Sequence, residues 1–307
     1  MSTHTPELPA APTTRRTSLL ASLALLSVCA AWGSTFFLIK DLLDRVPTLD
    51  FLAIRFSIVA AVTLVAGWPL VRRLPSRVKR HSVVLGGLYG VAQILQTAGL
   101  AHTAASVSGF ITGMYVVFTP IIAAFIMRSR ITPMTWAAVS LATLGLGVLT
   151  LSGLSVGYGE AITLVSAILY ALHIVGLGAW STARDAVGMS ILQLVVIAVL
   201  CTVATLPDGI VLPPTPRDWL SVLYMALVAG GLAMLAQTWA QAHLTPTRTA
   251  IIMSMEPVFA SFFAVLLGGE SVTTRLLLGG SMVLTAMLVV ELLPRRKVEG
   301  EVAHLAV

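Results

Sequence analysis

Residues 248–270, RTAIIMSMEPVFASFFAVLLGGE, form an apolar stretch of bilayer length that carries Glu256 directly before Pro257. At about 1.5 Å of rise per residue, Glu256 lies about 12 Å from Arg248 and about 21 Å from Glu270, near the middle of a hydrocarbon core roughly 30 Å thick. An acid at that depth is costly unless it faces protein or water. Pro257 lacks a backbone donor and is expected to bend the helix beside the acid. The stretch therefore predicts a polar interior within a membrane protein.

The composition agrees with this prediction. The chain has 307 residues, of which 57% are hydrophobic and 10% are charged, and its mean hydropathy is +0.93. A soluble domain has about 25% charged residues. The net charge of +6 does not indicate nucleic-acid binding, because Lys and Arg are spread over short loops. Cys29 and Cys201 lie in apolar segments, so neither a disulfide framework nor a metal site is expected, and no cofactor motif is present.

Ten segments of bilayer length predict an all-α membrane protein with ten transmembrane helices. Residues 1–18 and 294–307 are expected to be cytoplasmic tails, the first of them disordered, and residues 19–152 and 158–293 to be two five-helix units. Arg15-Arg16 before an apolar run resembles a signal peptide, but the run continues to Ile39 without a convincing cleavage site, which favours a first membrane helix. The predicted spans are 19–39, 49–69, 82–101, 106–127, 134–152, 158–180, 188–206, 219–241, 248–268 and 275–293.

The distribution of basic residues predicts the orientation. With the N-terminus in the cytoplasm, fourteen of the 19 Lys and Arg residues fall inside, and Arg55 lies within the second span. Only Lys40, Arg45, Arg217 and Arg275 fall outside. Cytoplasmic loops carry an excess of Lys and Arg. The count therefore predicts a multi-pass membrane protein with both termini in the cytoplasm.

The two halves of the chain resemble each other. Gln96-Thr97 matches Gln237-Thr238 at a sequence offset of 141 (237 − 96), and Thr119-Pro120 matches Glu256-Pro257 at 137 (256 − 119). Since five spans are an odd number, the second half would enter the membrane from the opposite side, which gives two inverted five-helix repeats around a central cavity. Two proline-interrupted helices at corresponding places indicate a binding site at the repeat interface. We therefore expect helix bends at Pro120 and Pro257.

Small residues predict where helices approach one another closely. Gly86 and Gly90 in the third span form a small-xxx-small pattern, as do Gly109 and Gly113 in the fourth. Such patterns occur where the backbones of two membrane helices are in contact. Close packing is the favoured interpretation of these glycines.

Polar and aromatic residues within the spans are candidates for substrate binding. Glu256 is either a proton carrier, because burial in an apolar cavity favours its neutral form, or a structural acid bonded to the turn around Ser254. His173 and Tyr170 share a face of the sixth span and, with further aromatic residues, are expected to form a wall for an amphipathic organic substrate, although a membrane histidine is also often an interhelical partner. The further residues of this wall are Tyr115 and Phe118, together with Trp32, which corresponds to His173 at an offset of 141 (173 − 32) and could equally lie in the core or face lipid.

Two other polar side chains have alternative interpretations. Gln96 either contacts substrate or, as the favoured interpretation, bonds a neighbouring helix together with Gln93. Arg55 lies about 6 Å from Phe51 along the helix and either extends to the lipid headgroups, as the favoured interpretation, or acts as an outer gate by pairing with Asp41, Asp44 or Asp50.

Four motifs together resemble the EamA family of drug/metabolite transporters. They are Trp32-Gly33-Ser34-Thr35-Phe36-Phe37, the segment around Arg55 (residues 51–56), Thr119-Pro120, and residues 255–260 followed by Leu-Gly-Gly-Glu270. The resemblance covers about residues 19–293. It implies a ten-helix inner-membrane transporter with a five-plus-five inverted repeat that moves small metabolites or drugs, often outward.

We therefore expect a secondary transporter that exports small organic molecules by alternating access, with proton coupling as one option. The alternative is a facilitative, channel-like permease; rings of like charge, typical of channels, are not evident. An enzyme is not expected, because the pattern G-x-S-x-G at residues 153–157 falls in a short loop rather than in a strand–turn–helix. The expected partners are a small-molecule substrate and the lipid bilayer, without nucleic acid, and the chain is expected to be a monomer or a homodimer.

Overall fold

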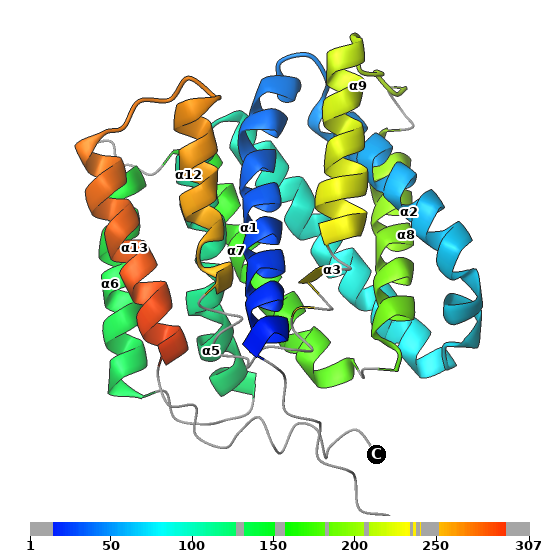
Figure 1. Ribbon diagram of the computed structural model, residues 1–307, viewed down its shortest axis with the longest axis horizontal. Helices are drawn as coiled ribbons and strands as arrows, with labels where there is room; N and C mark the ends of the chain where they lie inside the picture. Colours follow the sequence, from blue (N-terminus) through cyan, green and yellow to red (C-terminus); the bar gives the residue numbers. More distant parts are fainter. Residues whose placement is uncertain are drawn as a thin grey trace, which may run out of the picture.

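The computed structural model describes residues 15–126, 132–150, 157–181, 184–205, 209–233, 236–237, 240 and 252–292, and every regular element within these ranges is a helix (Figure 1). In chain order the helices are α1 (Arg15–Leu43), α2 (Thr48–Arg73), α3 (Ser76–Ala101), α4 (Ala105–Gly113), α5 (Tyr115–Ile126), α6 (Pro133–Thr150), α7 (Tyr158–Trp180), α8 (Ala186–Thr205), α9 (Pro216–Leu223), η1 (Tyr224–Leu232), α12 (Glu256–Leu266) and α13 (Thr274–Leu292).

The helices have the length and composition of membrane spans. Among the described residues, six helical runs are long and apolar enough to cross a bilayer: α1, α2, α3, the combined run of α4 and α5, α7 and α8. Three shorter apolar helices lie within α6, α12 and α13. The chain is therefore a membrane protein, as its composition predicts.

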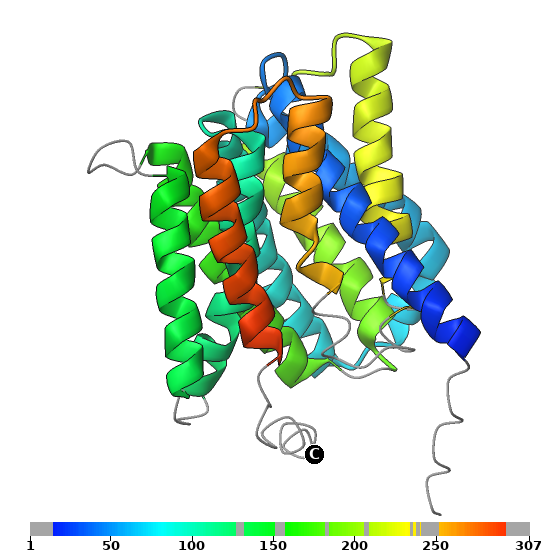
Figure 2. The same ribbon diagram turned by 60° about the vertical axis from the view of Figure 1, so that its left-hand side comes forward.

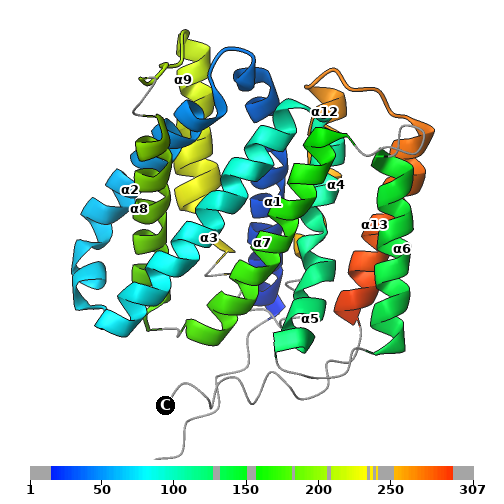
Figure 3. The ribbon, with the colours of Figure 1, turned by 180° about the vertical axis from the view of Figure 1, so that it is seen from behind.

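The helices pack into a bundle with two lateral pairs. Helix α2 packs along α8 on one side and α6 along α13 on the other (Figure 1). Helix α1 lies between these pairs and packs against α12 (Figure 2). Helices α3 and α7 pack against each other across the back of the bundle (Figure 3). One buried apolar cluster joins α1, α2 and α8, and a second joins α4, α6 and α13.

Glycines allow the central helices to touch. A Cβ atom on Gly33 of α1 would lie 2.7 Å from the backbone nitrogen of Ala260, and one on Gly109 of α4 would lie 2.6 Å from the Cβ of Ala260. Ala260 is fully buried between them, one turn after Glu256. Small residues at such crossings bring backbones together in membranes. The contact of α1, α4 and α12 therefore fixes the start of α12, where Glu256 lies.

At two places in the chain a tightened turn interrupts a run of helix. The N–H of Met114 donates to the carbonyl of Ile111 (3.1 Å) and the N–H of Met255 to that of Ile252 (3.0 Å), a spacing of three residues in both cases. Helix α5 begins directly after the first turn and α12 directly after the second. The two donors, like the two acceptors, are related by the offset of 141 at which Gln96-Thr97 matches Gln237-Thr238.

The positions of these turns contradict the prediction that Pro120 and Pro257 bend their helices. Pro257 lies in the first turn of α12, where a residue without an N–H is well tolerated, so it begins a helix rather than bending one. In the first half the interruption falls at Met114 rather than at Pro120, which lies inside α5. The hydroxyl of Thr119 donates to the carbonyl of Tyr115 (2.7 Å), which supports the turn before Pro120. At the offset of 141, Tyr115 rather than Thr119 corresponds to Glu256.

Polar contacts tie the helices together at the end of the bundle where α1 ends. The ammonium group of Lys40 donates to the carbonyls of Leu100 (3.0 Å), Ala101 (3.1 Å) and Thr103 (2.7 Å), which close the C-terminus of α3. Glu270, after α12, accepts hydrogen bonds from the first residues of α4: the N–H of Ala105 (2.6 Å) and both the N–H and the hydroxyl of Ser106. The corner between α3 and α4 is thus held from two sides.

A third contact at this end joins α1 to α9. Arg45 forms ion pairs with Asp218 (2.7 Å) and Asp41 (2.6 Å). Asp218 also accepts from the hydroxyl of Thr215 (2.6 Å) and completes a capping box at the start of α9. The hydrogen bonds of Arg45 and Thr215 lower the pKa of the Asp218 carboxyl below its ordinary value.

Several predictions concern residues outside the described ranges. They include residues 1–14 of the predicted N-terminal tail, the predicted C-terminal tail (294–307), most of the G-x-S-x-G pattern (153–156), Thr238 and Arg248.

Candidate functional site

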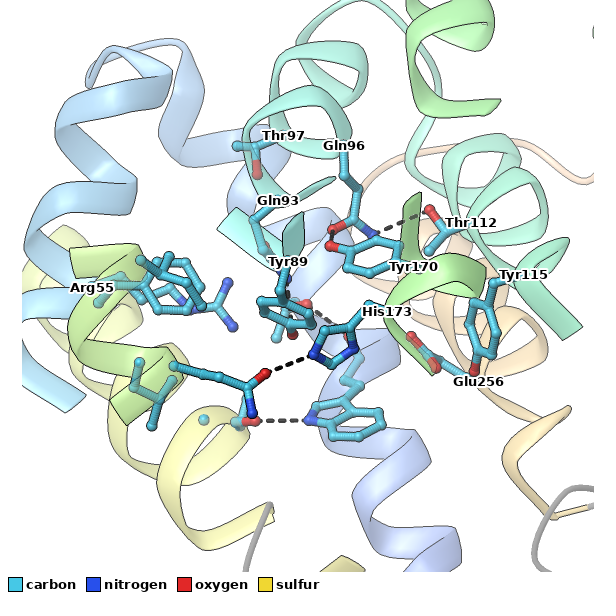
Figure 4. A pocket seen from close by; sticks show the side chains of 18 of the residues that line it. Arg55, Tyr89, Gln93, Gln96, Thr97, Thr112, Tyr115, Tyr170, His173 and Glu256 are labelled. Carbon is cyan, nitrogen blue, oxygen red and sulfur yellow. Dashed lines mark hydrogen bonds between the residues drawn. The ribbon is translucent and has the colours of Figure 1, made fainter. Parts of the chain in front are cut away.

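A cavity of about 310 Å³ lies at the centre of the bundle, between α1, α2, α3, α7, α8 and the starts of α5 and α12 (Figure 4). Its walls come from both halves of the chain. The cavity gathers most of the residues that the sequence singled out, which are Trp32, Arg55, Gln96, Tyr115, Tyr170, His173 and Glu256.

Phe118 does not line this cavity. It packs against the apolar cluster of α4, α6 and α13. Tyr115, three residues earlier, borders the cavity because α5 begins there, directly after the turn at Met114. Only the first turn of α5 reaches the cavity. Of the two α5 residues predicted for the aromatic wall, Tyr115 therefore contributes to it and Phe118 does not.

Trp32 connects α1 to an irregular helix. Its indole N–H donates to the carbonyl of Ala229 (2.7 Å) in η1, a π-helix of nine residues. Ala229 and Gly230 also line the cavity. Wide turns of this type occur often at functional sites. This hydrogen bond from the indole N–H holds the Trp32 ring at the cavity wall.

A hydrogen-bond chain joins α3, α4 and α7. The hydroxyl of Tyr170 donates to Oε1 of Gln96 (2.8 Å), and Nε2 of Gln96 donates to the hydroxyl of Thr112 (3.1 Å). Each of the three side chains lines the cavity (Figure 4). Gln96 therefore bonds two neighbouring helices, which is the structural role that its position predicts, and it does so at the cavity wall.

His173 is held by α8 and faces an aromatic neighbour. A hydrogen bond joins its Nε2 to Oε1 of Gln193 (2.7 Å). The ring of Tyr89 lies 5.0 Å from the His173 ring and 5.3 Å from the Tyr170 ring, measured between centroids. The hydroxyl of Tyr89 accepts from Nε2 of Gln93 (3.2 Å). These contacts build an aromatic wall with paired polar edges.

Arg55 is buried and does not extend to the lipid headgroups. Its side chain lines the cavity, only 9% of the residue is exposed, and its guanidinium carbon lies 6.0 Å from the Phe51 ring centroid and 5.4 Å from that of Phe56. Asp50, a predicted partner, instead accepts from the N–H of Val211 (3.0 Å). Among the described residues Arg55 has no ion pair within 4.0 Å. It therefore presents its charge to the cavity.

Glu256 lies on another part of the wall, at the first residue of α12. The side chain of Tyr115 lies beside its carboxylate (Figure 4). The offset of 141 also relates Tyr115 to Glu256, so the residue that follows each tightened turn meets its counterpart from the other half. The acid faces the cavity rather than lipid, as the sequence requires.

Tyr89 and Gln193 also line the cavity, and neither was singled out from the sequence. Tyr89, Gln93 and Gln96 recur at spacings of four and three in α3, so a helical face drawn through the two glutamines would have included the tyrosine. Gln193 has no such signal, because it is a single amide in the otherwise apolar α8.

Comparisons with known proteins agree with this architecture. A sequence model of the EamA-like transporter family matches residues 19–151 and 157–292. A protein of Archaeoglobus fulgidus described as an uncharacterized transporter is 27% identical over 277 residues, which covers 89% of this chain and 86% of the relative. A solved crystal structure with 19% sequence identity superimposes with a TM-score of 0.62, covers 90% of this chain and 96% of its own, and supports the fold alone.

Proposed function

Because the chain belongs to the EamA-like transporter family, we propose that it is a secondary transporter that exports small organic metabolites or drugs across the inner cell membrane by alternating access. The observation that carries this proposal is the cavity of about 310 Å³, which both halves of the chain line and which contains Glu256 at the start of a helix. A mostly apolar cavity with a few placed polar groups suits a small organic ligand.

The proposed architecture is ten membrane crossings in two inverted five-helix repeats, with both termini in the cytoplasm. The tightened turns at Met114 and Met255, which the offset of 141 relates, support it. So do the two lateral pairs, because at the same offset α2 corresponds to α8 and α6 to α13. A twofold axis that relates the halves would pack an element against its own counterpart in this way. The excess of basic residues in the predicted cytoplasmic loops supports the orientation.

Alternating access requires that one end of the cavity be closed while the other opens. The contacts of Lys40, Arg45 and Glu270 gather at one end of the bundle. In the proposed orientation this end is external. We infer that these contacts hold the external side closed in the present conformation and must break when substrate leaves outward.

Glu256 is the proposed proton carrier. Its carboxylate lies in the cavity beside Tyr115, so a proton and a substrate can compete for the same wall. Glu256→Gln is expected to abolish transport driven by a pH gradient while the protein remains folded. Glu160→Gln, in the first turn of α7 and outside the cavity lining, is the matched control and should retain it. Equal pH-driven transport by both variants would remove Glu256 from the coupling mechanism.

Counterflow in proteoliposomes tests the proposal as a whole. Ligands are first selected by their effect on the melting temperature of the detergent-purified protein, from amino acids, sugars and toxic aromatic compounds. A carrier is expected to show saturable flux and to accumulate labelled ligand transiently against unlabelled ligand on the other side. Flux that neither saturates nor shows counterflow would instead identify a channel-like permease.

A further inference from the structure

The cavity contains a buried cation whose charge no described acid balances at close range. Arg55 is nine-tenths buried and packs over the rings of Phe51 and Phe56. Two of the acids predicted as its partners bond elsewhere, Asp50 to the N–H of Val211 and Asp41 to Arg45. A guanidinium inside a membrane protein is costly without a counter-ion. Its position therefore indicates an anionic group that arrives with a ligand.

Most neutral polar side chains of the cavity wall already bond to protein. Tyr170 donates to Gln96 and Gln96 to Thr112, while His173 is bonded to Gln193 and Trp32 to a backbone carbonyl. A ligand that used these groups would have to break existing hydrogen bonds. The formal charges of the lining, Arg55 and Glu256, are the groups left to contribute new strong contacts.

Arg55 and Glu256 lie on different parts of the wall, with Tyr89 and His173 between them in the close-up (Figure 4). The carboxylate of Glu256 lines the cavity beside Tyr115, and its oxygens can accept hydrogen bonds from a ligand donor. The apolar surface between the two charges comes from the Tyr89 ring and its contacts with Tyr170 and His173. The site thus has a cationic part, an aromatic middle and an anionic part.

We propose that the cavity binds an amphipathic aminocarboxylate, with the carboxylate of the ligand on Arg55 and its ammonium group directed toward Glu256. The inference rests on the proposed transport function and specifies its substrate class. An arginine fork matches a carboxylate in two parallel hydrogen bonds, and a carboxylate attracts an ammonium group. A ligand with both charges balances both wall residues at once, whereas a ligand with one charge leaves the other uncompensated. The aromatic middle accommodates the apolar body of the ligand.

The test uses two sets of ligands that differ only in their charged groups. In the first set, 4-(aminomethyl)benzoate carries its charges at opposite ends of a ring and is compared with benzylamine and benzoate. In the second set, phenylalanine carries its charges on one carbon and is compared with phenethylamine and 3-phenylpropionate. Affinities are measured on the detergent-purified full chain by calorimetry, with the melting temperature as a second readout.

At least one aminocarboxylate is expected to bind about tenfold or more tightly than both of its singly charged analogues. Arg55→Gln should remove its advantage over the amine, and Glu256→Gln its advantage over the acid. Arg55→Lys, which keeps the charge but loses the fork, should retain only part of the advantage over the amine and remains informative if Arg55→Gln does not fold. Arg80→Gln, exposed near the start of α3, is the control and should change neither.

Equal affinities within both sets, no binding by either aminocarboxylate, or an advantage that survives both Gln substitutions would overturn the proposal. These outcomes are separable from failure of the transport function. Saturable counterflow of a neutral ligand would refute the charge assignment and leave the transporter intact. Charge-selective binding without any flux would retain the ligand class and refute transport.

Discussion

Gly86 and Gly87 are neighbours in α3 with different surroundings, and they provide a direct test of how α3 packs on α8. A Cβ atom on Gly86 would lie 2.9 Å from the Cβ of Val196 and 3.0 Å from the Cα of Gln193, whereas a Cβ on Gly87 would meet nothing within 4 Å. Gln193 holds His173 at the cavity wall. A displacement of the Gln193 backbone is therefore expected to disturb His173 in the binding site.

The magnitude follows from comparing the two alanine variants. Replacing glycine by alanine inside a helix is favourable by about 1 kcal/mol, and this gain applies equally to Gly86→Ala and Gly87→Ala. The overlap applies to Gly86→Ala alone, because its neighbours at 3.0 Å or less include backbone that cannot rotate away. Overpacking of this type costs about 1–3 kcal/mol. Gly87→Ala should therefore be neutral or stabilising, with Gly86→Ala about 1–3 kcal/mol less stable than Gly87→Ala.

The free energy of unfolding can be measured by titrating sodium dodecyl sulfate into detergent-purified protein and following tryptophan fluorescence. Ligand affinity is measured on the same samples, and we expect it to fall for Gly86→Ala and to stay unchanged for Gly87→Ala. Equal stability and equal affinity of the two variants would refute the packing of α3 on α8 described above.

Two further predictions concern the end of the bundle where α1 ends. Glu270→Gln should weaken the hydrogen bonds to Ala105 and Ser106 and so increase the labelling of an Ile39→Cys reporter by a membrane-impermeant maleimide added from outside; unchanged labelling would separate this contact from closure. Because the pKa of Asp218 is lowered in the folded protein, its contribution is present above its ordinary pKa of about 4 and is lost as the pH falls through the lowered value. Asp218→Asn should therefore reduce the melting temperature at neutral pH and reduce the further loss below about pH 4, and an acid response equal to that of the wild type would contradict this.

The sequence was sufficient to predict the membrane class and several of the residues that line the cavity, Glu256 among them. Glu256 within an apolar stretch could only face protein or water, and the structure places it on the cavity wall. The close approach predicted from Gly109 is also found, at Ala260. Both predictions hold because the competing arrangements would cost too much free energy to form.

Other features depended on tertiary contacts that the sequence does not encode locally. Arg55 was assigned to the lipid headgroups because its depth below the membrane surface allows that position, but depth alone does not give the side of the helix that faces the cavity. Phe118 was grouped with Tyr115 as an aromatic residue of the same span, but α5 begins at Tyr115 and only its first residue lines the cavity, while Phe118 packs against the cluster of α4, α6 and α13. The correction for Arg55 requires knowing which face of α2 meets the cavity, and the correction for Phe118 requires knowing where α5 begins.

The error at Pro120 shows how the proposed repeat diverged. A proline was used to align the halves because it is the most visible helix-breaking residue, yet the breaks fall at Met114 and Met255, and the first half has no proline directly after its break. The two turns therefore share a hydrogen-bond spacing, whereas the residues that follow them differ. In the proposed repeat Tyr115 and Glu256 are counterparts, and they lie side by side at the cavity (Figure 4). In an inverted repeat, only residues close to the axis can meet their counterparts. Because the two halves carry different residues at this position, a hydroxyl from the first half and a carboxylate from the second form a pair within one site. Two identical acids here would repel each other and two tyrosines would lack a charge, so we infer that the unequal pair is what gives the cavity its single central carboxylate.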